Sequence, residues 1–262
     1  MVLQRLWNRV PILTKDFVDE GIISLASNAE LTQNALHAFD TFVAIRTNDS
    51  GSSSSKIRLS KNRRRQQRTK HSSTIPKVGN SGNPELTVND YFFEYQRLHG
   101  YAHGTPKLSD APEVSKLKHA LQTESELYFH LLGGASSSVI SSLIQGGIAS
   151  LDIWAAIQKG EGAYHKDHVH EDVLLSGVYY AKVPEGSAPI IFHKPALNSE
   201  INSKDSVTIY PKEGQVIIFP PWLLHGVPMS ENENNPSRVS YAFNLSGAYA
   251  DPWGLTKNVE EN

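Results

Sequence analysis

The sequence predicts a mainly β protein, a jelly-roll or cupin-like barrel with supporting helices in its N-terminal part. Two observations lead to this prediction. Apolar residues recur at helical spacing over much of residues 1–147, and after Gly147 the pattern changes to short β-like runs separated by turns. No internal repeat accompanies the change, and barrels of this length often form one unit, so we expect a single domain over residues 1–262.

The predicted helices come first along the chain. Four apolar residues approximate one face of a helix, namely Leu31, Leu36, Phe39 and Val43. Thr14 with Asp16 could start an earlier helix, because short polar side chains favour helix N-termini. Helical periodicity returns at residues 86–98 and 114–132, and a short helix is predicted at 136–144.

A segment of different composition, residues 50–84, interrupts these helices. It is rich in Gly, Ser, Pro and Asn, and residues 56–70 include the basic run RLSKNRRRQQRTK. Such a composition buries little apolar surface, so we expect a disordered insertion. The basic run could instead be a nuclear-localisation or nucleic-acid patch. Because no aromatic residue interleaves with the charges, we favour a solvated surface segment and do not expect a nucleic-acid partner.

The barrel is expected over residues 148–250. Its predicted strands are six short apolar runs at 151–157, 173–183, 189–193, 207–210, 215–219 and 239–245. Gly and Pro residues between the runs supply the turns.

The composition narrows the chemistry. The 262 residues include no cysteine, which excludes disulfides, thiolate zinc sites, iron–sulfur clusters and a cysteine nucleophile. Any metal must be held by His, Asp or Glu, and the chain has 11 histidines. The net charge of −2 gives the whole molecule no strong preference for nucleic acid or membrane.

The expected location is intracellular. The first residues reach Lys15 and Asp16 without a sustained apolar run, so we expect no secretory signal. No stretch approaches the roughly 18 apolar residues of a membrane span, and no membrane partner is expected. A soluble, cytoplasmic protein is the default expectation, and the basic run at 56–70 leaves the nucleus open.

Three histidines are candidate metal ligands. His168 and His170 lie in YHKDHVHEDVLLSGVYY, and His225 lies in IIFPPWLLHGVPM. Side chains two residues apart on a strand point to the same side, so His168 and His170 can aim at one point. His225 could supply a third ligand from across the barrel. Three ligands on one face leave other coordination positions open, as in the facial triad of non-haem iron sites.

An arginine after the third histidine is the candidate anion ligand. Arg238 begins the last predicted strand, and a fixed guanidinium can hold a carboxylate through two parallel hydrogen bonds. Ser240, two residues on, faces the same way and can donate its hydroxyl.

These motifs together resemble a known family. The segment 154–244 is similar to the double-stranded β-helix core of the 2-oxoglutarate/iron(II) oxygenases, especially members with an H-x-H…SGVYY…FPxWLxH…RxS pattern. The matching text is HVH at 168–170, SGVYY at 176–180, PPWLLH at 220–225, RVS at 238–240 and FN at 243–244. The match covers roughly a third of the chain, and its order and spacing agree throughout.

The resemblance implies an oxidoreductase with iron(II) on His168, His170 and His225. It also implies that Arg238, with Ser240, holds the distal carboxylate of 2-oxoglutarate. Such a dioxygenase consumes dioxygen, releases succinate and CO₂, and by default hydroxylates an unactivated C–H bond. A small molecule or a protein could be the substrate, and the sequence does not decide between them.

One position departs from the wider superfamily, in which His-x-Asp or His-x-Glu precedes the distal histidine. Here His170 occupies the middle position. The upstream triplet 165–167 spells His-x-Asp, and Glu171 is adjacent to His170 but would point to the opposite face of a strand. We prefer His168 with His170, because their distance from the SGVYY run suits the family pattern.

Further residues are weaker candidates. One of Tyr179 and Tyr180 must face inward on a strand. We assign Tyr180 to the cosubstrate and keep Tyr179 as a possible pocket residue. Other possible pocket residues are Tyr164, His193, Trp222 and Asn244. Two other functions stay open, a cupin-like metalloenzyme that does not use 2-oxoglutarate and a non-catalytic binding protein on the same barrel.

Overall fold

The computed structural model describes residues 1–7, 10–49, 108, 111–132, 142–158, 163–195, 205–229 and 237–247. The insertion predicted at 50–84 and the helix predicted at 86–98 lie outside the described residues. The helix predicted at 136–144 is described only from residue 142, and residues 142–145 are helical.

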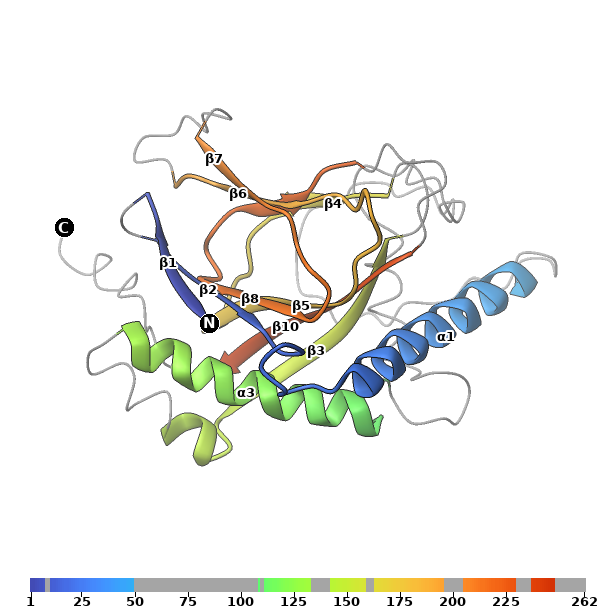
Figure 1. Ribbon diagram of the computed structural model, residues 1–262, viewed down its shortest axis with the longest axis horizontal. Helices are drawn as coiled ribbons and strands as arrows, with labels where there is room; N and C mark the ends of the chain where they lie inside the picture. Colours follow the sequence, from blue (N-terminus) through green and yellow to red (C-terminus); the bar gives the residue numbers. More distant parts are fainter. Residues whose placement is uncertain are drawn as a thin grey trace, which may run out of the picture.

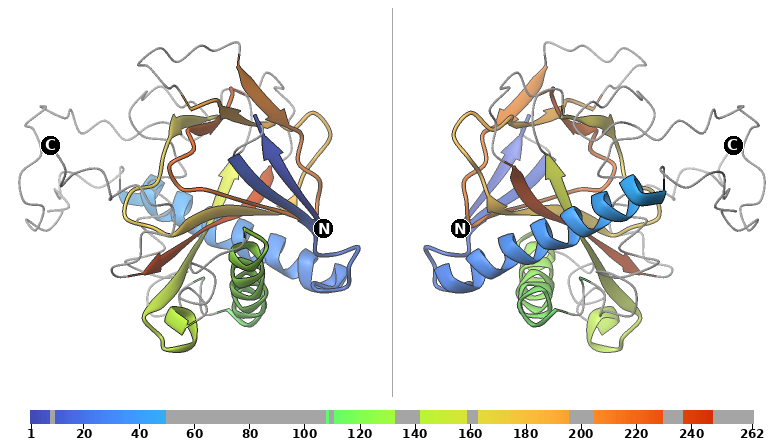
Figure 2. Two further views of the ribbon diagram at one scale, coloured as in Figure 1. Left: turned by 90° about the vertical axis from the view of Figure 1, so that its left-hand side faces the viewer. Right: turned by 90° about the vertical axis from the view of Figure 1, so that its right-hand side faces the viewer.

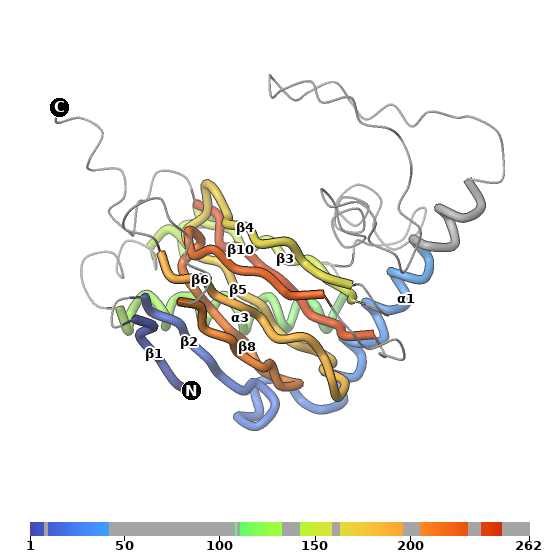
Figure 3. The backbone as a smooth tube through the Cα atoms, turned by 90° about the horizontal axis from the view of Figure 1, so that it is seen from above, coloured from blue at the N-terminus to red at the C-terminus, as the bar shows by residue number. Residues whose placement is uncertain are grey.

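The described strands form two antiparallel sheets that face each other (Figure 1). The larger sheet has the order β1 (Val2–Leu6), β2 (Val10–Asp16), β8 (Gln215–Phe219), β5 (Leu175–Lys182), β10 (Arg238–Gly247) and β3 (Ala149–Gln158). The smaller sheet has the order β4 (His165–His168), β9 (His225–Val227), β6 (Ile190–His193) and β7 (Ser206–Ile209). Figure 3 shows strands of the larger sheet side by side from above.

From β3 to β10 the chain passes back and forth between the sheets. Strands β3, β5, β8 and β10 belong to the larger sheet, and β4, β6, β7 and β9 belong to the smaller one. These eight strands form two facing sheets of four strands each, which is the arrangement of a double-stranded β-helix. The predicted barrel is therefore confirmed. Strands β1 and β2 extend the larger sheet beyond β8.

Residue alternation gives the larger sheet two different faces. On β10, the apolar residues Val239, Tyr241 and Phe243 belong to the core shared with the helices. Arg238 and Ser240 point the other way and line a pocket inside the barrel. The period of two along one strand therefore separates residues that stabilise the fold from residues that can bind a ligand.

Two helices cover the outer face of the larger sheet (Figures 1 and 2). The predicted helices at 31–43 and 114–132 correspond to α1 (Leu25–Asp49) and α3 (Pro112–Leu132). Helix α1 is tied to β5 by Asn28, whose amide Nδ2 donates to the carbonyl of Ala181 at 2.9 Å. Helix α3 is tied to β2 by the hydroxyl of Tyr128, which donates to the carbonyl of Pro11 at 2.9 Å. Such bonds fix where each helix lies against the sheet.

The beginning of the chain differs from the prediction. Thr14 and Asp16 do not start a helix, because residues 10–16 form β2. Asp16 does use its side chain as a local acceptor, but its Oδ1 accepts from the backbone N–H groups of Val18 and Asp19 at 3.0 and 2.8 Å and closes a turn. No helix among the described residues is long and apolar enough to cross a membrane.

Candidate active site

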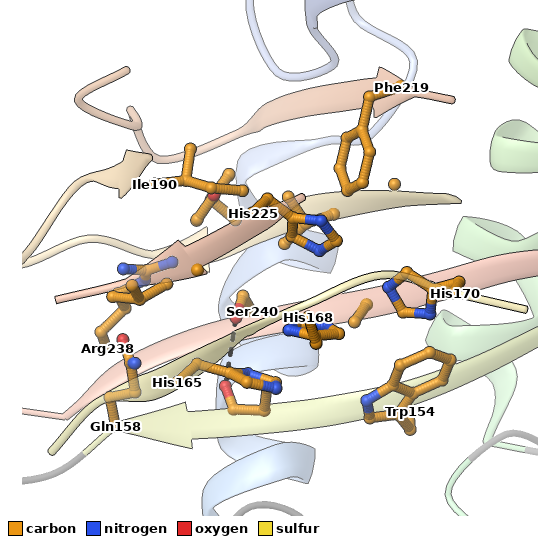
Figure 4. Close-up of a pocket in the computed structure, with 17 residues that line it drawn as sticks. Trp154, Gln158, His165, His168, His170, Ile190, Phe219, His225, Arg238 and Ser240 are labelled. Carbon is orange, nitrogen blue, oxygen red and sulfur yellow. Dashed lines mark hydrogen bonds between the residues drawn. The ribbon is translucent and has the colours of Figure 1, made fainter. Parts of the chain in front are cut away.

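Three imidazole rings converge inside the barrel. His168 ends β4, His170 follows two residues later, and His225 begins β9. His168 and His225 are direct Cα partners in the pairing of β4 with β9, so the sheet itself brings them together. One ring nitrogen from each of the three residues lies within 4.8 Å of the others. Figure 4 shows the three rings grouped around one point of the pocket.

Two of these rings are oriented by the backbone. The Nδ1 atom of His168 lies 2.8 Å from the carbonyl oxygen of Lys166, and the Nδ1 atom of His225 lies 2.8 Å from the carbonyl oxygen of Leu223. A carbonyl oxygen only accepts, so each Nδ1 carries the proton. The unprotonated Nε2 of each ring is then free to bind a metal.

Burial keeps two of the rings uncharged. Desolvation lowers the pKa of His170 to about 3, and repulsion from His168 and His165 adds to this effect. Desolvation also lowers the pKa of His225 well below its usual value, with a further contribution from His168. Because only a neutral imidazole can ligate a metal, both rings are in the charge state that metal binding requires at neutral pH.

No carboxylate joins the cluster among the described residues. Asp167 points away from it and is half exposed, with Oδ2 3.0 Å from Nε2 of His193. Glu171 is exposed. His165 lines the same pocket, and its ring stacks on that of His168 with centroids 4.5 Å apart. The donor set is therefore three imidazoles, which suits a divalent first-row metal such as iron, cobalt, nickel or zinc.

The same pocket contains a buried guanidinium. Arg238 is 4% exposed, and its Nη1 donates to the carbonyl of Ala188 at 2.7 Å. Its Cζ lies 4.9 Å from the ring centroid of Tyr180. In Figure 4, Arg238 and Gln158 lie at one end of the pocket, and Trp154 and His170 lie at the other. Burial lowers the pKa of Arg238, while the neighbouring Tyr180 acts in the opposite direction.

Two donors at this end of the pocket have no acceptor. The Nε of Arg238 and the hydroxyl of Tyr180 are buried, and neither has a hydrogen-bond partner within the described part of the chain. No described carboxylate pairs with Arg238 within salt-bridge distance, either. A buried guanidinium Nε and a buried hydroxyl without acceptors are costly, so the arrangement fits an anionic ligand that accepts from both.

The other predicted residues divide between the two faces. Ser240 lines the pocket, and its hydroxyl donates to the carbonyl of Ala156 at 3.2 Å. Tyr179 faces the helices, where its hydroxyl donates to Oδ1 of Asn28 at 2.7 Å. The suggested pocket role of Tyr179 is therefore corrected, because neighbouring residues on a strand face opposite ways and Tyr180 takes the inner side.

Several of the weaker candidates do not reach the pocket. Among the described residues, its walls do not include Tyr164, His193 or Trp222. Trp222 packs against the apolar core on the barrel side of the larger sheet. Asn244 lies outside the walls as well, but its side chain contacts the ring of His170.

Sequence reasoning missed part of the wall. Trp154 and Gln158 line the pocket from β3, with Ala156 between them at the same two-residue spacing. Phe219 contributes from β8, and its ring centroid lies 4.5 Å from that of His225. The spacing of residues 154, 156 and 158 was a usable signal, because every second residue of β3 faces the barrel interior.

The segment that builds this site is similar in sequence to a known protein family. Residues 152–244 match the family described as "Putative 2OG-Fe(II) oxygenase". No curated protein matches the sequence. The matching segment begins in β3 and ends in β10, so it holds the three histidines, Arg238 and Ser240.

Solved structures give distant matches. A Pseudomonas putida prolyl-4-hydroxylase is 13% identical over 53% of this chain and 68% of its own, with a TM-score of 0.36. An oxidoreductase of the 2OG-Fe(II) oxygenase family from Burkholderia pseudomallei is 20% identical over 47% and 57%, with a TM-score of 0.29. EvdO2 from Micromonospora carbonacea var. aurantiaca, solved with 2-oxoglutarate, is 11% identical over 54% and 62%, with a TM-score of 0.37. The chain thus spans less than two thirds of the second and third of these proteins.

The sequence match and the observed sheet order agree on the same segment. Within it, three histidines and a buried arginine lie in one pocket of a double-stranded β-helix. Residues 152–244 are therefore similar to the family described as "Putative 2OG-Fe(II) oxygenase", and in this structure they form the part of the barrel that holds the three histidines and the buried arginine.

Proposed function

We propose that this protein is an iron(II)- and 2-oxoglutarate-dependent oxygenase that hydroxylates an unactivated C–H bond and releases succinate and CO₂. The observation that carries the proposal is the buried Arg238, which has no carboxylate partner among the described residues and shares a pocket with three histidines. A metal site alone would not need this cation. A cosubstrate with a carboxylate at its far end gives the cation a function.

Each residue then has a defined task. His168, His170 and His225 would hold iron(II) through neutral imidazoles. Arg238 and Tyr180 would hold the distal carboxylate of 2-oxoglutarate, with charge-assisted hydrogen bonds from the guanidinium. When bound, iron(II) with 2-oxoglutarate and dioxygen supplies the oxidising chemistry, and the protein supplies binding and orientation. Ser240 would offer its hydroxyl to the same cosubstrate from the neighbouring position on β10.

The remaining walls and the domain organisation belong to the same proposal. Trp154, His165 and Gln158 line the pocket, and a substrate would meet them on approaching the metal. A small molecule or a protein side chain fits the proposal, and a nucleic acid is not proposed.

We further propose one domain over residues 1–262, in which residues 148–250 form the catalytic core and the N-terminal part buttresses it.

Anaerobic titration of 2-oxoglutarate into the iron-loaded protein tests the proposal. Chelation of iron by the cosubstrate is expected to give a visible charge-transfer absorption, and later addition of oxygen should yield succinate. The control is the same titration without iron. Metal binding with no response to millimolar 2-oxoglutarate would favour a cupin-like metalloenzyme, and the absence of metal binding would favour a non-catalytic barrel.

Replacement of Tyr180 by phenylalanine should have opposite effects on stability and on cosubstrate binding. The change removes a buried hydroxyl without a partner in the described structure, so the ligand-free protein is expected to gain about 1 kcal/mol in free energy of unfolding. The same hydroxyl would donate to the bound carboxylate, so the Kd for 2-oxoglutarate should rise about tenfold. Urea unfolding and the absorption titration measure the two effects. A loss of stability with unchanged Kd would mean that the hydroxyl serves packing alone.

A further inference from the structure

The three candidate metal ligands are not oriented in the same way. His168 and His225 each direct Nδ1 to the carbonyl two residues upstream, at 2.8 Å in both cases. For His170, the group that the structure places beside Nδ1 is the side-chain amide of Asn244, with Nδ2 at 3.2 Å. This ring therefore contacts a side chain from β10, whereas the other two contact the backbone.

The amide of Asn244 has two possible orientations. With Nδ2 toward His170, the amide donates to Nδ1, and a neutral ring must then carry its proton on Nε2, where it blocks metal binding. With Oδ1 toward His170, the amide accepts from a protonated Nδ1, and Nε2 is left free for a metal. Rotation of the amide by half a turn exchanges the two states, because oxygen and nitrogen occupy nearly the same positions.

A serine on the neighbouring strand can accommodate both orientations. The hydroxyl of Ser176 lies 2.8 Å from Oδ1 of Asn244 and donates to it. A hydroxyl can also accept, so Ser176 can receive a hydrogen bond from Nδ2 when the amide is turned. The two residues are direct Cα partners in the pairing of β5 with β10, and Ser176 is 1% exposed. The sheet therefore holds Ser176 beside Asn244, and Ser176 is protected from water while Asn244 is partly buried.

We propose that Asn244, supported by Ser176, is a positioning residue that sets the tautomer of His170 and so prepares the third ligand for metal. The proposal rests on the proposed function, because it takes the three histidines as the metal site. Asn244 touches neither metal nor cosubstrate and acts only through the ring of His170. Outer residues of this kind change metal affinity about 10- to 100-fold when replaced.

The experiment uses the full chain. Histidine tautomers are first assigned in the metal-free protein by long-range ¹H–¹⁵N correlation, because a ring that ligates zinc through Nε2 must carry its proton on Nδ1 in any case. In the metal-free wild type, His170 is expected to carry its proton on Nδ1. Zinc affinity is measured by competition with a chelator in Asn244→Ala, Asn244→Asp and Ser176→Ala. The control variant is Asn28→Ala. Like Asn244→Ala it removes a side-chain amide, but Asn28 is buried on the helix side of the larger sheet, away from the histidines.

We expect Asn244→Ala to raise the Kd for zinc about 10- to 100-fold. Asn244→Asp should keep it near the wild-type value, because a carboxylate retains the acceptor. Ser176→Ala should raise it less, and Asn28→Ala should lower stability without changing zinc affinity. A carboxylate also attracts any cation, so wild-type zinc affinity in Asn244→Asp does not by itself prove the positioning role. The tautomer of His170 in the wild type tests that role directly, even if Asn244→Ala does not fold.

Two results would overturn the proposal while leaving the metal site intact. One is a proton on Nε2 of His170 in the metal-free wild type, and the other is wild-type zinc affinity in Asn244→Ala. Failure of the wild type to bind zinc, cobalt or iron would instead refute the metal site of the proposed function, and the positioning role with it.

Discussion

Replacing His225 by alanine is expected to abolish stoichiometric metal binding. The residue begins β9 and is 5% exposed. The centroid of its ring lies 4.4 Å from the ring centroid of His168. Loss of one of three ligands should raise the Kd for a divalent first-row metal by roughly a hundredfold or more. Elemental analysis of the purified variant and titration with cobalt(II) measure the effect. Unchanged metal content would remove His225 from the site.

Two further variants separate ligand loss from damage to the core. The ring of His225 packs against Phe219 and Phe192, so alanine also leaves a cavity. His225→Gln fills more of that space and should still lose the metal. His193→Gln is the matched control, because His193 lies on the same sheet and contacts Asp167 outside the cluster. It should keep the metal, and an equal loss in His193→Gln would point to general damage to the smaller sheet.

The histidines were predictable because a strand repeats every two residues. The two-residue spacing predicted that His168 and His170 share a side, and both rings line the pocket although β4 ends at His168. Arg238, Ser240 and Asn244 share one side of β10 by the same rule. The rule also required Tyr179 and Tyr180 to face opposite ways, but it could not say which one faces inward. That choice depends on pairing with β8 and β10 and on helix α1, which covers only one face.

The parts that escaped prediction have weak local signals. Strand β2 has four consecutive buried residues, Val10 to Leu13, so it lacks the alternation by which a strand is recognised, and Pro11 argues against one. Strands β4 and β9 have four and three residues, and their register is irregular between His165 and His168. Such short strands exist because the barrel supplies their partners, and this tertiary effect cannot be read from local sequence.

Replacing Arg238 by alanine or lysine is expected to remove most 2-oxoglutarate binding while leaving metal binding in place. The guanidinium is buried and has an unpartnered Nε within the described structure, so the bound carboxylate would be its natural acceptor. Charge-assisted hydrogen bonds contribute about 1.5–3 kcal/mol each, so loss of a two-bond contact should raise the Kd a hundredfold or more. Lysine is not expected to restore 2-oxoglutarate binding, because an ammonium cannot form the same planar pair of bonds.

The measurement is again the absorption titration with anaerobic, iron-loaded protein, now compared across variants. Ser240→Ala should raise the Kd less than Arg238→Ala, since it removes one neutral donor that already has an acceptor in Ala156. Arg5→Ala on the exposed edge strand β1 is the matched control and should leave the Kd unchanged. If wild-type protein binds 2-oxoglutarate and Arg238→Ala binds it equally well, the carboxylate must lie elsewhere in the barrel. The buried guanidinium would then be a structural group held by Ala188 and Tyr180, and the proposed function would lose the observation that carries it.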